Sequence, residues 1–262
     1  RLRAGDLGPL HAGAERHGLA LDTSAGWCLI RQLVSAVAMF HRNAPDLAHG
    51  AIAPERIIVT PNARLVIVEH VLGGALEHLG YSPERYWKEL RVARPRSTRQ
   101  PQSGHGADVT QIGVVALSLL LGRPAHDDEY PLRLEEGVES AWAKSASGDR
   151  EPMPASLRAW LTRALQLDAR TSFASAIQAS AELDKVFEES DYILAPQQLD
   201  VFLSRCRASV DRPAGQIATG HSKPAALAAA PQPISVVNPV PPPVNVPLTR
   251  RMTESAVATP RQ

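Results

Sequence analysis

The chain has 262 residues, 44% of them apolar, which is enough for one domain of about 200 residues and additional segments. Its formal net charge of +1 provides no global field for nucleic acid or an anionic membrane, and its longest apolar run, 114–121, is too short to span a bilayer. The two cysteines, Cys28 and Cys206, cannot form a disulfide framework or a zinc site, no signal peptide opens the chain, and a reducing, cytoplasmic compartment is therefore expected.

The first long predicted helix begins near residue 23. Thr23 or Ser24 supplies a side chain of the kind that caps a helix N-terminus. The turn Asn43-Ala44-Pro45 ends the helix, because the residue before a proline avoids helical conformation. Between these points the apolar residues recur every three or four positions, as on one amphipathic face: Trp27, Ile30, Leu33, Val34, Val37 and Phe40.

A loop and a β-hairpin are expected next. The loop is apolar and contains one histidine, with the sequence His49-Gly50-Ala51-Ile52-Ala53-Pro54-Glu55-Arg56. Two β-branched runs, 56–60 and 64–68, then flank the turn residues Pro61-Asn62-Ala63. This arrangement predicts a short hairpin. Glu69-His70-Val71 follows it directly.

Three amphipathic helices are predicted in the second half, at 156–165, 172–187 and about 196–207, each with an apolar stripe for core packing. The composition changes from about Ala208. No aromatic residue follows Phe202, and eight prolines lie between Pro224 and Pro247. Such a segment cannot bury enough apolar area to offset the cost of ordering, so residues 208–262 are predicted to be a disordered Pro/Ala-rich linker.

The loop at 49–56 resembles the catalytic loop of protein kinases, H-R-D-x-x-x-x-N. His49 and Pro54 match the usual residue types. The position of the catalytic aspartate holds Ala51, that of the lysine holds Ala53, and that of the metal-binding asparagine holds Arg56. A methyl group cannot accept a proton from a substrate hydroxyl, and a guanidinium cannot coordinate Mg²⁺. The resemblance therefore implies a kinase-shaped protein that does not phosphorylate.

The spacing after the loop also resembles the kinase pattern. Kinases place a hairpin here with D-F-G directly after it, and Glu69 lies at the D-F-G aspartate position, 18 residues after Ala51. Val71 replaces the flexible glycine, and the second metal ligand is already Arg56. One carboxylate without partners is a poor Mg²⁺ site. The expectation is no catalytic residue and no metal site, with ATP and Mg²⁺ relevant only if a longer form retains a nucleotide site.

The segment 107–124 resembles the central buried helix of the kinase C-lobe. Asp108, Gly113, Gly122 and Pro124 fall in register with the family form. In kinases this aspartate hydrogen-bonds the backbone of the catalytic loop and ties the loop to the helix. The resemblance therefore implies that Asp108, Gly113 and His49 are structural anchors, and that Asp108 must be satisfied by hydrogen bonds because it is buried.

Two segments compete for the A-P-E position of the family. Ser82-Pro83-Glu84 agrees better in letters, whereas Arg94-Pro95-Arg96 agrees better in its spacing to Glu69 and Asp108 and is preferred. The distal arginine that pairs with this position in kinases corresponds to Arg170, a further expected anchor. On the first alignment a Glu84–Arg170 ion pair persists; on the second it is replaced by something that the sequence does not identify.

The resemblance implies a mainly α fold: a protein kinase-like C-terminal lobe with one small β-hairpin, followed by a disordered Pro-rich tail. Residues 1–24 correspond to a hinge-like lead-in with a short helix, 25–207 to the C-lobe with an appended helix, and 208–262 to the linker. No glycine-rich loop precedes His49, and the first lysine is Lys88. The ATP phosphate clamp is therefore expected to be missing from this chain, and the first residue, Arg1, suggests a fragment.

A basic stretch at 85–99 contains six arginines and lysines against one acid, Glu89. Arg91, Arg94 and Arg96 are candidate residues for binding an acidic or phosphorylated protein partner. A solvated helix face followed by a mobile loop is the preferred alternative. The acidic loop 126–131 is interpreted as a solvated surface loop rather than a metal site, because consecutive side chains point in different directions.

The function implied is noncatalytic: a pseudokinase of bacterial Ser/Thr kinase type that acts as a scaffold or regulatory interaction module in signalling. One alternative is a divergent Ser/Thr kinase that binds ATP in a full-length form with an N-lobe. Another is a helical adaptor unrelated to kinases, which would have no reason for strands at 56–68. Protein partners are expected, without nucleic acid and without a membrane span in this chain.

Overall fold

The long helix predicted after residue 22 is present as α2, Thr23–Asn43, and its apolar stripe is buried. The structure is a computed structural model, and it describes residues 21, 23–60, 62–69, 72–95, 104–144, 150–189 and 196–210. All of them belong to one unit of the chain, which extends to Gln216. The predicted lead-in before residue 21 and the predicted linker after residue 210 lie outside the described residues.

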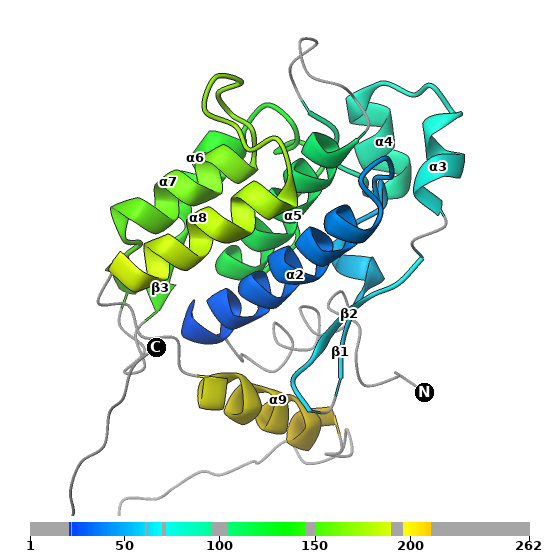
Figure 1. Ribbon diagram of the computed structural model, residues 1–262. Coiled ribbons are helices and arrows are strands. Elements are labelled where there is room, and N and C mark those ends of the chain that lie inside the picture. Colours follow the sequence, from blue (N-terminus) through cyan, green and yellow to red (C-terminus); the bar gives the residue numbers. More distant parts are fainter. Residues whose placement is uncertain are drawn as a thin grey trace, which may run out of the picture. The chain divides into compact units, whose positions relative to one another are not determined.

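The remaining elements follow in chain order (Figure 1). The loop leads into a 3₁₀ turn, η1, and a hairpin, after which two short helices precede the buried helix α5. Their bounds are η1 Pro54–Arg56, β1 Ile57–Val59, β2 Leu65–Ile67, α3 Leu72–Glu77, α4 Pro83–Leu90, α5 His105–Leu121, α6 Leu134–Ser140, β3 Trp142–Lys144, β4 Arg150–Pro152, α7 Ala155–Ala164, α8 Ala176–Glu189 and α9 Pro196–Val210.

The core lies where α2, α5, α7 and α8 pack side by side (Figure 1). Helix α5 is buried along almost its whole length, because most of its residues are apolar and buried polar side chains such as Asp108, Gln111 and Ser118 are hydrogen-bonded. Trp27 of α2 meets Trp160 of α7 edge-to-face, with ring centroids 6.0 Å apart. Trp160 also donates from Nε1 to the carbonyl of Ala179 in α8 at 2.8 Å. Trp160 of α7 is therefore linked to α2 by a ring contact and to α8 by a hydrogen bond.

The predicted hairpin is confirmed. Strands β1 and β2 are antiparallel, and Ile58 lies opposite Val66. Thr60 closes the turn by donating its amide to the carbonyl of Arg64 at 2.8 Å. Gln32 of α2 then holds the hairpin to the helix, because its amide nitrogen donates to the Ala63 carbonyl and its oxygen accepts from the Leu65 amide, both at 3.0 Å.

Some boundaries and one element differ from the predictions. A second antiparallel strand pair, β3 with β4, was not predicted; each strand has only three residues, too few for a periodic pattern. Helix α8 begins at Ala176 rather than Ser172, and α9 continues to Val210 rather than ending at Arg207. Among the described residues, none of the helices is both long and apolar enough to cross a bilayer.

Candidate functional site

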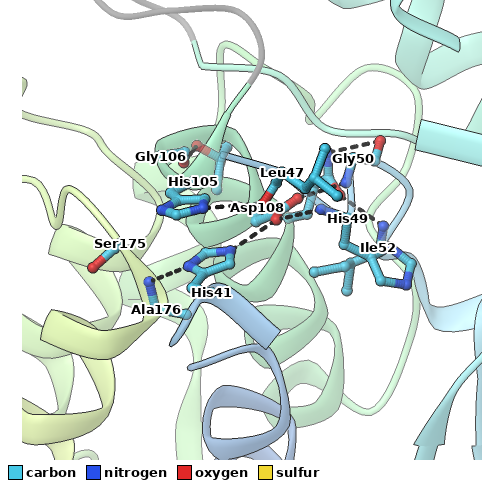
Figure 2. Close-up of polar contacts among 12 residues, drawn as sticks. His41, Leu47, His49, Gly50, Ile52, His105, Gly106, Asp108, Ser175 and Ala176 are labelled. Atoms are coloured by element: carbon cyan, nitrogen blue, oxygen red, sulfur yellow. Dashed lines mark hydrogen bonds and ion pairs between the residues drawn. The ribbon is translucent and has the colours of Figure 1, made fainter. Parts of the chain in front are cut away.

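The loop before the hairpin is held to α5 through the carboxylate of Asp108 (Figure 2). Asp108 is fully buried. Its Oδ2 accepts from the backbone amide of His49 and its Oδ1 from that of Gly50, each at 2.7 Å. The predicted hydrogen bonding between Asp108 and the loop backbone is confirmed. The buried charge is compensated by short hydrogen bonds to backbone donors, which are the strong kind.

A third donor to Asp108 is His41, a residue that the sequence did not single out. His41 is buried in the last turn of α2, and its Nε2 lies 2.9 Å from Oδ2 of Asp108. Its Nδ1 lies 3.3 Å from the backbone nitrogen of Ala176, at the start of α8. Because a backbone amide only donates, Nδ1 accepts and carries no proton. The ring is therefore the neutral Nε2–H tautomer, which donates to Asp108.

His105 completes this cluster on the other side of the His41 ring (Figure 2). The two imidazoles stack with centroids 3.7 Å apart and an angle of 9° between their planes. Nε2 of His105 lies 3.0 Å from the carbonyl oxygen of Leu47, in the loop. The cluster thus joins the end of α2, the starts of α5 and α8, and the loop.

Gln111, one turn after Asp108 on α5, is a second tether that the sequence analysis missed. It is fully buried. Its oxygen accepts from the Ile52 amide at 2.7 Å, and its nitrogen donates to the Gly50 carbonyl at 3.2 Å and to the Ala93 carbonyl at 3.3 Å. Its spacing of three residues from Asp108 places both side chains on one helix face, which is the signal that could have found it.

The positions of the loop that depart from the kinase pattern hold buried methyl groups and a paired guanidinium. Ala51 and Ala53 are buried. Nε of Arg56 lies 2.9 Å from Oε2 of Glu69, and its Nη2 donates to the Leu90 carbonyl at 3.0 Å. The two residues at the metal-ligand positions of the kinase pattern therefore neutralise each other. Val71, at the glycine position of D-F-G, lies outside the described residues.

Arg56 and Glu69, the residues at the two metal-ligand positions, do not form a Mg²⁺ site in this arrangement. A guanidinium lies against the only carboxylate at these two positions, whereas Mg²⁺ requires near-octahedral oxygen ligands. Across the part of the chain that the structure describes, no group of three or more His, Cys, Asp or Glu residues is placed to hold a metal ion.

Of the predicted partner-binding arginines, the structure describes Arg91 and Arg94, and only Arg91 lies near the surface. Arg94 is buried with its guanidinium 4.5 Å from the ring centre of Tyr86, so its assignment to a surface patch is wrong. Its backbone amide also donates to the Tyr130 hydroxyl at 2.6 Å. Arg91 remains near the surface, where it forms an ion pair with Asp127. Arg96 lies outside the described residues.

The structure does not support the Glu84–Arg170 ion pair. Ser82 caps α4, Pro83 is its first residue, and Glu84 is exposed in the first turn, where it faces the positive end of the helix dipole. Arg170 is exposed in the turn after α7, and no ion pair joins it to Glu84 in the described structure. Its backbone amide donates to Oδ1 of Asp168 at 2.9 Å, within the same turn. The preferred alternative, at Arg94-Pro95-Arg96, is only partly described.

Gly113 is an anchor for a steric reason. A β-carbon at this position would lie 2.7 Å from the backbone nitrogen of Leu165 and 2.8 Å from the carbonyl carbon of Ala164. Real β-carbons do not approach backbone atoms so closely, and α7 has no flexible side-chain end at this point that could move away. Gly113 therefore permits the close approach of α5 and α7.

The acidic loop after α5 is more ordered than the predicted solvated loop. Arg123 binds both carboxylate oxygens of Glu129, at 2.8 and 2.6 Å, and the His126 amide donates to the same carboxylate. The hydrogen bonds from Arg123, aided by that amide, lower the pKa of Glu129 to about 2. Tyr130, the next residue, is buried and packs on Trp87. The interpretation as a solvated surface loop holds for 126–128, which are exposed, whereas Glu129 is half-buried and Tyr130 and Pro131 are buried.

Comparison with known proteins identifies no relative: no protein-family model matches the chain, and neither does any curated protein.

Proposed function

We propose that this chain is a catalytically inactive, protein kinase-like domain that acts as a scaffold or regulatory module for a protein partner. The observation that carries the proposal is the tether from Asp108 to the His49 and Gly50 amides. The loop is held as the kinase pattern requires, although the side chains that would perform phosphoryl transfer are replaced. A supported loop that lacks the reactive side chains is what a pseudokinase would retain.

Three positions support the proposed loss of phosphoryl-transfer activity. Ala51 has no group that can accept a proton from a hydroxyl, and Arg56 and Glu69 are paired with each other. Phosphoryl transfer depends on metal ions that neutralise the developing charge and on a residue that orients the nucleophile. Removing both should abolish most of the rate enhancement, so the proposed role requires neither ATP nor Mg²⁺.

The hairpin between the loop and Glu69 supports this proposal over a helical adaptor. Strands β1 and β2 occupy the place between loop and D-F-G position where the kinase pattern has a hairpin. An adaptor built only from helices has no need of them. The partner is proposed to be a protein, met in the cytoplasm. Of the two candidate contact residues that the structure describes, Arg91 lies partly at the surface and Arg94 is buried.

The second candidate is a divergent Ser/Thr kinase that binds ATP in a longer form with an N-lobe. The observation that favours it is the half-exposed carboxylate of Glu69 at the D-F-G position. Against it stands the guanidinium of Arg56, which neutralises that carboxylate at 2.9 Å. A cation would have to displace Arg56 before it could bind Glu69.

Nucleotide binding distinguishes the two candidates. Thermal unfolding of the chain, and of any longer natural form, is measured with ATP and ADP, each with and without Mg²⁺ or Mn²⁺. A ligand that binds only the folded state raises the melting temperature. The pseudokinase proposal predicts no metal-dependent shift and no transfer of labelled phosphate to a generic protein substrate. A metal-dependent shift that the Glu69→Ala variant loses would support the divergent kinase instead.

A further inference from the structure

Helix α3 lies on the protein with little burial of its own side chains. Gly73 is its only buried residue. Leu72 is exposed on the helix, and so is Leu79 just after it. One hydrogen bond to the following helix is present, from the Tyr86 hydroxyl to the Leu76 carbonyl at 2.7 Å. An element with so little buried apolar surface belongs to the least stable part of a fold.

The buried contact of α3 is backbone against backbone. A β-carbon on Gly73 would lie 1.9 Å from the carbonyl oxygen of His49 and 3.0 Å from Cα of Gly50. Gly50 itself has a φ of +71°, and a β-carbon there would lie 2.8 Å from Cα of Gly73. The start of α3 therefore covers the same loop backbone that Asp108 holds from the other side.

The chain enters α3 through Glu69, which has an unfavourable backbone conformation. Its φ is +64°, in the left-handed region that residues with a β-carbon rarely adopt. The carbonyl of Glu69 accepts from the Leu72 amide at 3.0 Å, which connects this residue to the first turn of α3. Other interactions must hold Glu69 in place, since its local preference is for another conformation.

Arg56 supplies such an interaction and is itself firmly attached. Its carbonyl accepts from the Val68 amide at 3.0 Å, and its amide donates to the Ala53 carbonyl at 2.9 Å. The side chain is mostly buried and reaches both Glu69 and the carbonyl of Leu90 at the end of α4. Arg56 thus links the hairpin, the entry to α3 and the end of α4.

We propose that the Arg56–Glu69 ion pair is a latch that keeps α3 closed over the loop backbone at His49 and Gly50. Loss of the pair releases Glu69 from its left-handed conformation and allows α3 to open locally, which exposes the loop without unfolding the core. The latch depends on the contacts of this chain and holds whether or not the domain descends from a kinase.

Hydrogen–deuterium exchange on the full chain tests the latch. In the variants Arg56→Gln and Glu69→Gln, the amides of residues 72–79 should exchange about three to ten times faster, the range expected for loss of one partly buried ion pair. Amides in the middle of α5 should keep their rates. The matched control is Glu89→Gln, which breaks the exposed Arg85–Glu89 pair in α4 and should leave residues 72–79 unchanged.

Two further measurements keep the test decisive if a variant folds poorly. In the unaltered protein, about 1 M salt should accelerate exchange in α3 by less than either variant does, because salt screens the half-exposed carboxylate of Glu69, whereas the mostly buried guanidinium of Arg56 is screened much less. Gly73→Ala should open α3 while leaving the ion pair in place, whereas Gly74→Ala, which meets open space, should not. Unchanged exchange in both latch variants, or acceleration that extends equally through α5, would overturn the proposal.

Discussion

His41 and Asp108, 67 residues apart in the sequence, meet in the buried centre of the protein with Nε2 of the histidine 2.9 Å from Oδ2 of the aspartate. Asp108 accepts in addition from the amides of His49 and Gly50. His41 accepts from the amide of Ala176. Two side chains thereby satisfy backbone donors from the loop and from α8, so the pair determines how three parts of the chain meet.

Replacement of Asp108 should therefore be severe. Asp108→Ala leaves three buried donors without an acceptor, and we expect a loss of about 3 to 5 kcal/mol in the free energy of unfolding. Urea denaturation followed by circular dichroism measures it. The control is Asp184→Ala, which breaks an exposed ion pair with Arg31 and should cost less than about 1 kcal/mol. Equal losses in the two variants would contradict the role of Asp108.

Replacement of His41 should cost less, because Asp108 retains two donors. His41→Phe keeps an aromatic ring in the cavity but leaves the Ala176 amide unpaired, and we expect a loss of about 1 to 3 kcal/mol. The same urea titration reports it. His78→Phe, at an exposed histidine of the α3 region, serves as the comparison and should be nearly neutral. A neutral His41→Phe would show that the cluster is not needed for stability.

Gly113→Ala should destabilise the protein by overpacking. The added methyl would lie 2.7 to 2.9 Å from backbone atoms of Ala164 and Leu165, so α7 must shift. We expect a loss of about 2 to 3 kcal/mol, measured by thermal or chemical denaturation. Gly106→Ala on the same helix meets only the end of the Gln166 side chain at 3.4 Å and is the matched control. A smaller effect at Gly113 than at Gly106 would refute the steric argument.

Lowering the pH should reduce the free energy of unfolding, partly through the protonation of Glu129. Hydrogen bonds from Arg123 lower the pKa of this carboxyl to about 2 in the folded state, below the ordinary value of a glutamate. The unfolded chain therefore takes up the proton first as the pH falls, and the stabilisation present above about pH 5 is lost progressively toward pH 2. Glu129 is about one-fifth exposed, and with allowance for screening we expect about 1 to 2 kcal/mol from this group.

Stability measured between pH 7 and pH 3 in the Glu129→Gln variant tests this prediction. The variant should be less stable than the unaltered protein at pH 7, and the difference should shrink toward pH 3. Glu135→Gln, at an exposed glutamate in α6, should leave the pH dependence nearly unchanged. Parallel pH curves for the Glu129→Gln variant and the unaltered protein would show that the Arg123 contact does not act in this way.

The elements that depend on local pattern could be predicted from the sequence alone. The three- and four-residue spacing from Trp27 onward predicted α2, and the Pro-Asn turn between β-branched runs predicted the hairpin. The hydrogen bonds from Asp108 to the loop followed from the kinase resemblance and are present. These features could be predicted because a helix or hairpin depends on residues near one another in the chain, and because one buried carboxylate requires donors.

Which distant side chains meet is set by the tertiary structure. His41 gave no signal in the sequence, and Gln111 gave only its spacing from Asp108, since the groups that they contact, such as the Ala176 and Ile52 amides, lie 135 and 59 residues away. Arg94 could be recognised as buried only once Tyr86 and Tyr130 were placed around it. The pairing of Arg56 with Glu69 likewise required the hairpin to bring both residues to one end. Burial and charge pairing depend on residues that are distant in the sequence and meet only in the packed chain, so a local sequence pattern does not predict them.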